Sequence, residues 1–149
     1  MIYISVLLDS DVGESEMGGP GGDIYDYCIV KINVVKLRGL KTGALFGHAN
    51  PYVAFALGTL REKTCVKWGG KTDWTWTSTL SFRISSAKLQ TCRLAVRVYD
   101  KERIRRKKLL GEVFVKLSGL QLTDIQSWFA LEGGDRSING DVYLGIQLV

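Results

Sequence analysis

Apolar and polar side chains alternate with a period of two through most of the chain from Tyr27 onward. Val30, Ile32 and Val34, for example, alternate with Lys31 and Asn33. Because successive side chains of a β-strand point to opposite faces, this period predicts strands with one buried face. The pattern recurs eight times, and we expect strands around residues 30–34, 53–57, 64–68, 76–82, 94–98, 113–117, 128–131 and 142–148.

The segments between these runs are short and rich in Gly, Asn, Asp and Lys, and none has the pattern of a long amphipathic helix. A chain of 149 residues suits a single domain with a hydrophobic core of its own. We therefore predict an all-β fold, an eight-stranded antiparallel β-sandwich. A closed barrel is the alternative.

The first 26 residues differ from the rest in composition. Residues 1–27 hold six acidic side chains and no Lys or Arg, and residues 18–22 read Gly-Gly-Pro-Gly-Gly. We predict an acidic, Gly-rich N-terminal segment at 1–26 and the β-sandwich domain at 27–149. Residues 1–8 are rich in β-branched side chains and could add an edge strand or a strand swapped between two copies; the sequence leaves this open.

The charge of the chain is unevenly distributed. Its net charge is +5, yet the residues after Tyr27 carry all 20 basic side chains and only nine of the 15 acidic ones, a net charge of +11. Such a domain attracts polyanions: an anionic lipid surface, a nucleic acid or an acidic protein. The charge indicates only the sign of the partner.

Few side chains could support catalysis or hold a cofactor. His48 is the only histidine, so a Ser-His-Asp or Cys-His site would have to use it, and it lies in a turn-like stretch. Cys28, Cys65 and Cys92 lack Cys-x-x-Cys spacing, which favours neither a zinc site nor a disulfide framework. Phosphate-binding glycine motifs are absent as well. We predict that the chain is not an enzyme and needs no cofactor.

The sequence contains no apolar run of membrane-spanning length. Its N-terminus lacks the basic region of a signal peptide. We expect a cytoplasmic protein.

Three stretches follow one another in an order typical of a known family. An early strand leads to a loop that ends in Asn-Pro-Tyr-Val at 50–53; residues 98–102 then read Val-Tyr-Asp-Lys-Glu, and 110–112 read Leu-Gly-Glu. Together they resemble a C2 domain, in which "DPYV", "V-Y-D-x-D" and "I-G-E" are typical. The resemblance covers residues 27–149. The closing strand at 140–148 resembles the family's type II connectivity, which is circularly permuted relative to type I.

The resemblance implies calcium-dependent docking on phospholipid, with acidic side chains of two apical loops as ligands. Calcium requires about six to eight oxygen ligands, several of them carboxylates. Only one of the five corresponding positions retains the family's aspartate, and one other is acidic. We predict no metal site, and interpret Asp100 as capping a turn or paired with Lys108. The five degenerate positions are Ala44, Asn50, Asp100, Glu102 and Lys108.

The same loops offer apolar tips within a cluster of cations, a combination suited to an anionic bilayer. A second basic patch resembles the lysine-rich strand with which many C2 domains bind phosphoinositides. The predicted lipid-binding residues are Leu45, Phe46, Arg103, Ile104, Arg105, Arg106, Lys107 and Lys108, and the predicted phosphoinositide patch is Arg61, Lys63 and Lys67.

We therefore predict a calcium-independent C2 module that docks peripherally on membranes rich in phosphoinositide or phosphatidylserine. The alternative is a C2 scaffold that binds no lipid and mediates protein–protein interaction, with a protein partner in a larger assembly. Nucleic-acid binding is the least favoured hypothesis; it would use Trp68, Trp74 and Trp76 as stacking platforms.

Overall fold

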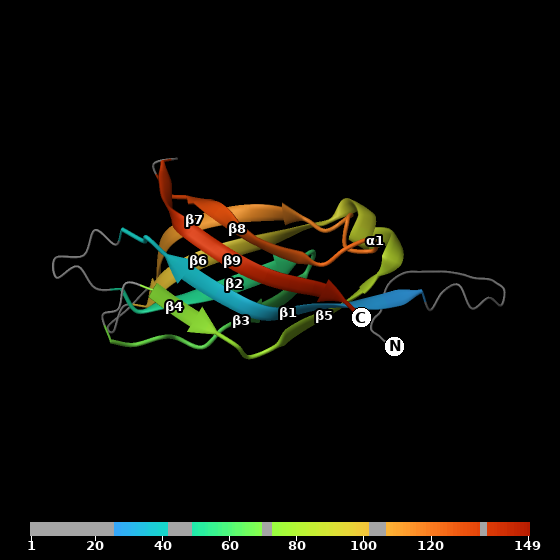
Figure 1. The fold of residues 1–149 in the computed structure, drawn as a ribbon, viewed down its shortest axis with the longest axis horizontal. Coiled ribbons are helices and arrows are strands. Elements are labelled where there is room, and N and C mark those ends of the chain that lie inside the picture. The colour runs from blue at the N-terminus through green and yellow to red at the C-terminus, as the bar shows by residue number, and fades with distance from the viewer. Residues whose placement is uncertain (1–25, 42–48, 70–72, 102–106, 135–136) are drawn as a thin grey trace.

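The computed structural model describes residues 26–41, 49–69, 73–101, 107–134 and 137–149. This part of the chain forms nine strands and one short helix (Figure 1). The elements are β1 (Tyr27–Arg38), β2 (Pro51–Leu57), β3 (Leu60–Lys63), β4 (Asp73–Trp76), β5 (Leu80–Ser85), α1 (Ser86–Thr91), β6 (Arg93–Lys101), β7 (Lys107–Lys116), β8 (Ile125–Glu132) and β9 (Ile138–Leu148).

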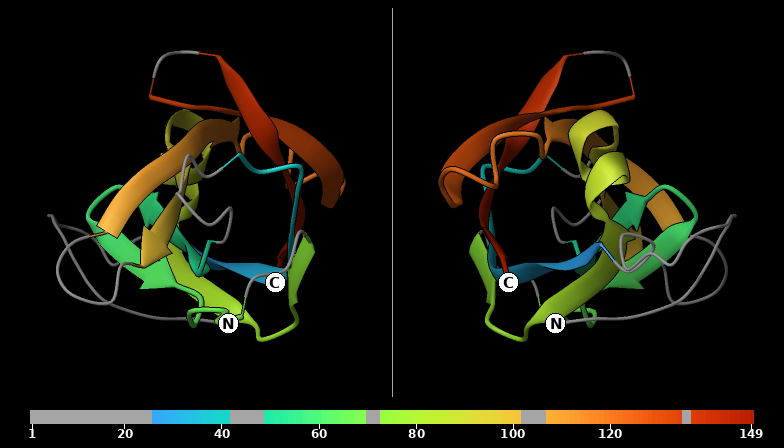
Figure 2. Two further views of the ribbon diagram at one scale, coloured as in Figure 1. Left: turned by 90° about the vertical axis from the view of Figure 1, so that its left-hand side faces the viewer. Right: turned by 90° about the vertical axis from the view of Figure 1, so that its right-hand side faces the viewer.

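The strands follow the order β3-β2-β6-β7-β8-β9-β1-β4, and β5 also pairs with β1. All neighbours are antiparallel. β7 and β8 are joined through a single residue pair, Glu112 and Glu132, so the sheet divides there into two layers. Figure 2 shows the strands curling around a common interior. The predicted all-β, antiparallel sandwich class is confirmed.

The core forms between the two layers because alternate side chains of each strand point inward. Leu94, Val96 and Val98 of β6 are fully buried, as the alternation predicts. β1 departs from strict alternation: the pairing of β1 with β9 shifts between Ile32 and Val34. This bulge moves the inward position by one residue, so Val35 is buried in place of Val34.

The strand expected at 64–68 is wrong, because β3 ends at Lys63. The side chain of Thr64 explains the end of the ladder. The Val53 N–H donates to the Thr64 hydroxyl at 2.9 Å, while the Thr64 N–H donates to the Val53 carbonyl at 2.9 Å. A side-chain oxygen therefore accepts a bond that a backbone carbonyl would accept in a continuing strand.

The single strand expected at 76–82 is also wrong. It is divided into β4 and β5, which pair with different parts of β1. The helix α1, which the alternation did not predict, follows β5 directly. Ser85 caps it by accepting a hydrogen bond from the Lys88 N–H at 3.2 Å.

Residues 1–8, for which an added or swapped strand was left open, and most of the acidic N-terminal segment lie outside the described residues, so the question stays open and the segment stays a prediction. In the part of the chain that the structure describes, no helix has the length and apolar character needed to cross a bilayer.

Candidate functional site

Several strand ends converge at the end of the molecule opposite α1, on the left in Figure 1. The pairing register brings Pro51 at the start of β2 beside Asp100 near the end of β6, and Lys101 beside Lys107 at the start of β7. We call this the apical end, defined by Asn50, Asp100, Lys101, Lys107 and Lys108.

Asp100 fastens the apical end rather than pointing into solvent. Its side chain is buried, with the residue 8% exposed, and its Oδ1 accepts a hydrogen bond from the Asn50 N–H at 2.9 Å. The Asn50 carbonyl accepts one from the Lys101 N–H at 2.9 Å, and the Asn50 side-chain oxygen accepts one from the Gly69 N–H at 3.2 Å. The Asp100 carboxylate thus ties the end of β6 to the residue before β2, a long-range contact; the interpretation that Asp100 caps the turn after it stays a prediction.

The degenerate calcium positions can be followed in part. Ala44 and Glu102 lie outside the described residues. Asp100 and Lys108 occupy facing positions of the β6–β7 ladder, which places a cation beside the one retained aspartate. Within the described ranges, no three His, Cys, Asp or Glu side chains lie close enough together to hold a metal ion. Calcium independence itself stays a prediction.

We expect Asp100→Ala to lower the free energy of unfolding by about 1–3 kcal/mol, because the partly buried Asn50 N–H loses its acceptor. Urea denaturation measures this loss. Asp100→Asn is the matched control, since its amide keeps an oxygen that can accept the same bond. An alanine variant as stable as the parent chain would contradict the stabilising role of this bond.

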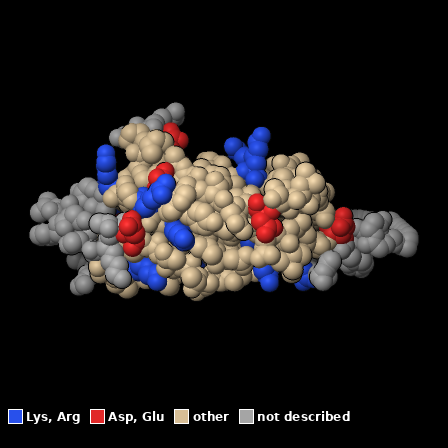
Figure 3. Space-filling model, viewed as in Figure 1, with Lys and Arg blue, Asp and Glu red and all other residues tan. Residues whose placement is uncertain are grey.

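The outer face of the layer β3–β2–β6–β7 is strongly basic. Alternation and register place seven cations and two tyrosines on it. Among the described residues of these four strands, Glu112 is the acidic side chain on this face. Its carboxylate oxygen lies 3.0 Å from the Arg97 Nε and forms an ion pair with it. The opposite layer, which faces the viewer in Figure 3, has acidic side chains among its basic ones. We call the first surface the basic face: Arg61, Lys63, Arg93, Arg97, Lys101, Lys107 and Lys116, with Tyr52 and Tyr99.

A stacked tyrosine pair lies at the apical side of the basic face. The rings of Tyr52 and Tyr99 are 5.5 Å apart between centroids and inclined by 25°. The Lys107 Nζ lies 4.4 Å from the centre of the Tyr99 ring, and the Lys63 Nζ lies 5.9 Å from that of Tyr52. These cation–π contacts hold an ammonium group at each side of the ring pair.

Burial raises the pKa of the Tyr52 phenol above its ordinary value, and the neighbouring Tyr99 adds to the rise. The phenol therefore stays protonated at physiological pH and remains a hydrogen-bond donor.

The predicted phosphoinositide patch is only partly gathered on one surface. Arg61 and Lys63 lie on β3 and share the basic face. Lys67 lies beyond the end of β3, where its Nζ is 5.9 Å from the ring centre of Trp76 in the other layer. The expectation that all three follow one strand by alternation is wrong for Lys67, because the strand ends before it.

The predicted lipid-binding residues are described only at their C-terminal end. Lys107 and Lys108 are exposed at the start of β7. The others lie outside the described residues: Leu45, Phe46, Arg103, Ile104, Arg105 and Arg106.

Sequence reasoning did not single out Tyr52, Tyr99 or Lys101 as site residues. Alternation gives their faces, but only strand pairing shows that the two tyrosines are neighbours.

Two of the three tryptophans invoked for nucleic-acid stacking are core residues. Trp74 and Trp76 are 5% and 3% exposed, whereas Trp68 is 54% exposed. The Trp76 indole N–H donates to the Cys65 carbonyl at 2.9 Å. Buried rings cannot stack on bases, so the basis of the nucleic-acid hypothesis is removed for this pair.

Comparison with known proteins agrees with this architecture. "Multiple C2 domain and transmembrane region protein 2" of Arabidopsis thaliana is 27% identical over 126 residues, which are 78% of this chain and 12% of that protein. The chain thus spans about an eighth of the length of this curated relative.

Solved structures share the fold. A C2 domain of a plant extended synaptotagmin 1 superposes with a TM-score of 0.70 at 23% identity, covering 81% of this chain and 93% of that one. A human GIVD cytosolic phospholipase A2 superposes with a TM-score of 0.66 at 19% identity, covering 82% and 17%. A family model described as "C2 domain" matches residues 28–131. The chain therefore belongs to the C2 domain family.

Proposed function

We propose that this chain is a C2 module that docks peripherally, without calcium, on membranes rich in phosphatidylserine or phosphoinositide. The family is mainly regulatory and lipid-binding rather than catalytic, which supports this proposal. The relative that carries a transmembrane region in its name is consistent with a C2 domain working beside a membrane. The expected location is the cytoplasmic surface of that membrane.

The observation that carries the proposal is the pair of ammonium groups held against the stacked tyrosines on the basic face. Lys63 and Lys107 flank Tyr52 and Tyr99, and Lys101 lies opposite Lys107. Lipid phosphates approaching this surface meet cations already in place, so little side-chain ordering is required on binding. The Tyr52 phenol adds a neutral donor beside them.

The strength of such docking follows from the number of cations. Each Lys or Arg near an anionic bilayer contributes about 1 kcal/mol. Four engaged cations give about 4 kcal/mol, which corresponds to a dissociation constant of about 1 mM. A single module would bind weakly and reversibly, and stable attachment would need several modules or a second anchor.

Calcium independence is supported by the apical contacts. The retained aspartate, Asp100, uses an oxygen to accept the hydrogen bond of the Asn50 N–H, and Lys108 faces it across the ladder. An arriving calcium ion would have to compete with that N–H and with the nearby ammonium group, while the other degenerate positions offer few carboxylates.

We propose that the apical loops add to the basic face. Leu45 and Phe46 would insert between headgroups, with Ile104 as a third apolar contact. Arg103, Arg105 and Arg106 directly precede Lys107 and Lys108 in sequence, so they extend the same run of cations. Arg61 and Lys63 would hold the phosphoinositide phosphates, and Lys67 would contribute from beyond the strand.

Vesicle sedimentation tests the proposal. The full chain is mixed with phosphatidylcholine vesicles, alone or with about 20% phosphatidylserine or about 5% phosphatidylinositol bisphosphate. We expect binding only to the anionic vesicles, equal binding with calcium and with EGTA, and a decrease as salt shortens the screening length. Strong stimulation by calcium, or equal binding to neutral vesicles, would contradict the proposal. Failure to bind any vesicle would favour the protein-scaffold alternative.

A further inference from the structure

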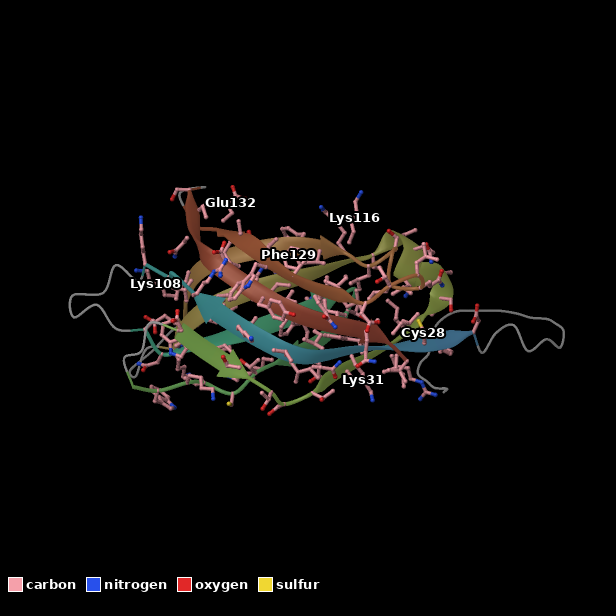
Figure 4. All side chains as sticks on the ribbon, viewed as in Figure 1. Cys28, Lys31, Lys108, Lys116, Phe129 and Glu132 are labelled. Carbon is pink, nitrogen blue, oxygen red and sulfur yellow. The ribbon has the colours of Figure 1, made fainter. Side chains whose placement is uncertain are left out.

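A second group of cations lies at the other end of the β6–β7 ladder. Arg93, the first residue of β6, faces Lys116, the last residue of β7. In Figure 4 Lys116 lies toward the end that carries α1, far from Lys108. The two residues border a surface hollow of about 190 Å³, which we call the basal hollow. It is lined by Gln90, Thr91, Cys92, Arg93, Lys116, Leu117 and Ser118.

The charges of the basal hollow are not balanced by nearby acids. Its lining contains two cations and no carboxylate. Neither Arg93 nor Lys116 takes part in the ion pairs found in the described ranges, such as Arg38 with Asp141 and Arg97 with Glu112. Like charges placed directly opposite each other in an antiparallel pair repel. An anion bound between them would relieve this repulsion.

The position of the Arg93 guanidinium is restrained. Its Cζ lies 5.1 Å from the centre of the Phe114 ring, and the Arg97 Cζ lies 5.7 Å from the same ring. A guanidinium resting on an aromatic ring keeps its N–H groups available at the ring's edge. Arg93 therefore lines the hollow as an exposed residue, while its guanidinium is held over the ring of Phe114, a residue outside the lining.

The rest of the lining supplies polar groups suited to an oxyanion. The Ser118 hydroxyl can donate a hydrogen bond to an anion, whereas the Thr91 hydroxyl donates to the Lys88 carbonyl at 3.4 Å. The carbonyl of Lys88, in the last turn of α1, is engaged by the Cys92 N–H at 2.8 Å, which reduces its repulsion of an anion. Two cations with the Ser118 hydroxyl form a donor set that matches the several oxygens of a phosphate group.

We propose that the basal hollow binds a phosphate group, carried either by a free inositol phosphate or by a lipid headgroup. Arg93 and Lys101 are eight residues apart on β6, a separation of about 26 Å along the strand. A bilayer at the apical end thus leaves the hollow open to solvent, which favours a free inositol phosphate. The site does not depend on the proposed membrane docking.

Titration of the full chain with inositol trisphosphate and with inorganic phosphate tests this site. We expect amide chemical-shift changes centred on Arg93 and on residues 116–118, larger for the trisphosphate. The double variant Arg93→Gln with Lys116→Gln should weaken trisphosphate binding at least tenfold, roughly the loss expected for two charge-assisted contacts. Because the variant removes a repulsion, it should fold as well as the parent chain, which circular dichroism checks.

The matched control is Lys101→Gln with Lys107→Gln, the other facing pair of cations in the same ladder and the same change in net charge. It should retain trisphosphate binding at the basal hollow. Equal weakening in both double variants, or no localised shift with either probe, would overturn the proposal.

A vesicle arm with phosphatidylinositol bisphosphate distinguishes the two sources of phosphate. If the Arg93 and Lys116 substitutions reduce binding of the free trisphosphate alone, the ligand is a free inositol phosphate. Because Arg93 and Lys116 also belong to the basic face, phosphatidylserine vesicles of equal charge are the reference, and a greater loss with phosphatidylinositol bisphosphate than with phosphatidylserine vesicles would show that the site also accepts a headgroup. Since the trisphosphate arm uses no membrane, failure of vesicle docking leaves its result intact.

Discussion

Replacing Lys63 and Lys107 together by glutamate should lower binding to phosphatidylserine vesicles by a factor of about 100 to 1,000. Each substitution removes an attraction of about 1 kcal/mol and adds a repulsion of similar size. The two changes together therefore amount to about 4 kcal/mol, less whatever salt screens. Both lysines rest against the stacked tyrosines, so both charges are held at one surface. Vesicle sedimentation at low and moderate salt measures the effect.

The control is the double variant Lys31→Glu with Lys36→Glu on β1, in the opposite layer. It changes the net charge by the same amount, and Lys36 makes a comparable ring contact, with its Nζ 5.2 Å from the centre of Tyr143. Basic and acidic groups lie among one another on that layer (Figure 3), so we expect little loss of binding. An equal loss in both variants would mean that only net charge matters and that the basic face is no specific surface.

Replacing Gly140 by alanine should lower the free energy of unfolding by about 2–5 kcal/mol. Its φ is +74°, a conformation that side chains disfavour, and an added Cβ would lie 2.6 Å from the Arg38 carbonyl oxygen. The added Cβ would also lie 3.0 Å from the carbonyl carbon of Gly39 and 3.0 Å from the backbone nitrogen of Leu40. Backbone atoms cannot move aside as a flexible side chain would. For a domain of this size the melting temperature should fall by roughly 4–20 °C.

Gly58 provides the control for backbone conformation alone. Its φ is +62°, yet an added Cβ would meet nothing within 4 Å. Gly58→Ala should therefore cost only the conformational part, about 1–2 kcal/mol. If both variants lost the same stability in thermal and urea denaturation, close packing at Gly140 would not be the cause.

Gly140 also matters for the apical end through its neighbour. The Asn139 side chain accepts a hydrogen bond from the Lys41 N–H at 2.6 Å and donates to the carbonyls of Lys41 at 2.9 Å and Leu110 at 2.8 Å. It thereby joins the chain after β1 to β7 and β9. A shift at Gly140 should loosen these bonds, so reduced stability and weaker vesicle binding are expected together.

The period of two predicted most of the strands because it reflects a local property of extended backbone. β6 agrees with it closely: Leu94, Val96 and Val98 lie inward, and of the outward residues between them only the small Ala95 is also buried. The bulge between Ile32 and Val34 and the end of β3 before Thr64 could not be predicted this way. The bulge depends on how β1 pairs with β9, and the end of β3 depends on the hydrogen bond between the Val53 N–H and the Thr64 hydroxyl. Neither contact can be derived from the apolar pattern of one strand.

For the candidate site, the C2 resemblance implied that the loops around Asn50 and Asp100 meet at one end, and the bond from the Asn50 N–H to the Asp100 carboxylate joins these two segments. The pairing of Tyr52 with Tyr99, the position of Lys67 beyond its strand, and the pairing of Arg93 with Lys116 were not predictable.

From the sequence by itself follow the all-β class, the C2 resemblance, the excess of basic charge and the face on which residues of regular strands such as β6 lie. Only the tertiary structure decided which faces adjoin, and so which cations gather around the tyrosine pair and around the basal hollow. The physical reason is that alternation repeats identically in every strand, whereas strand order and register arise from contacts between residues far apart in the chain.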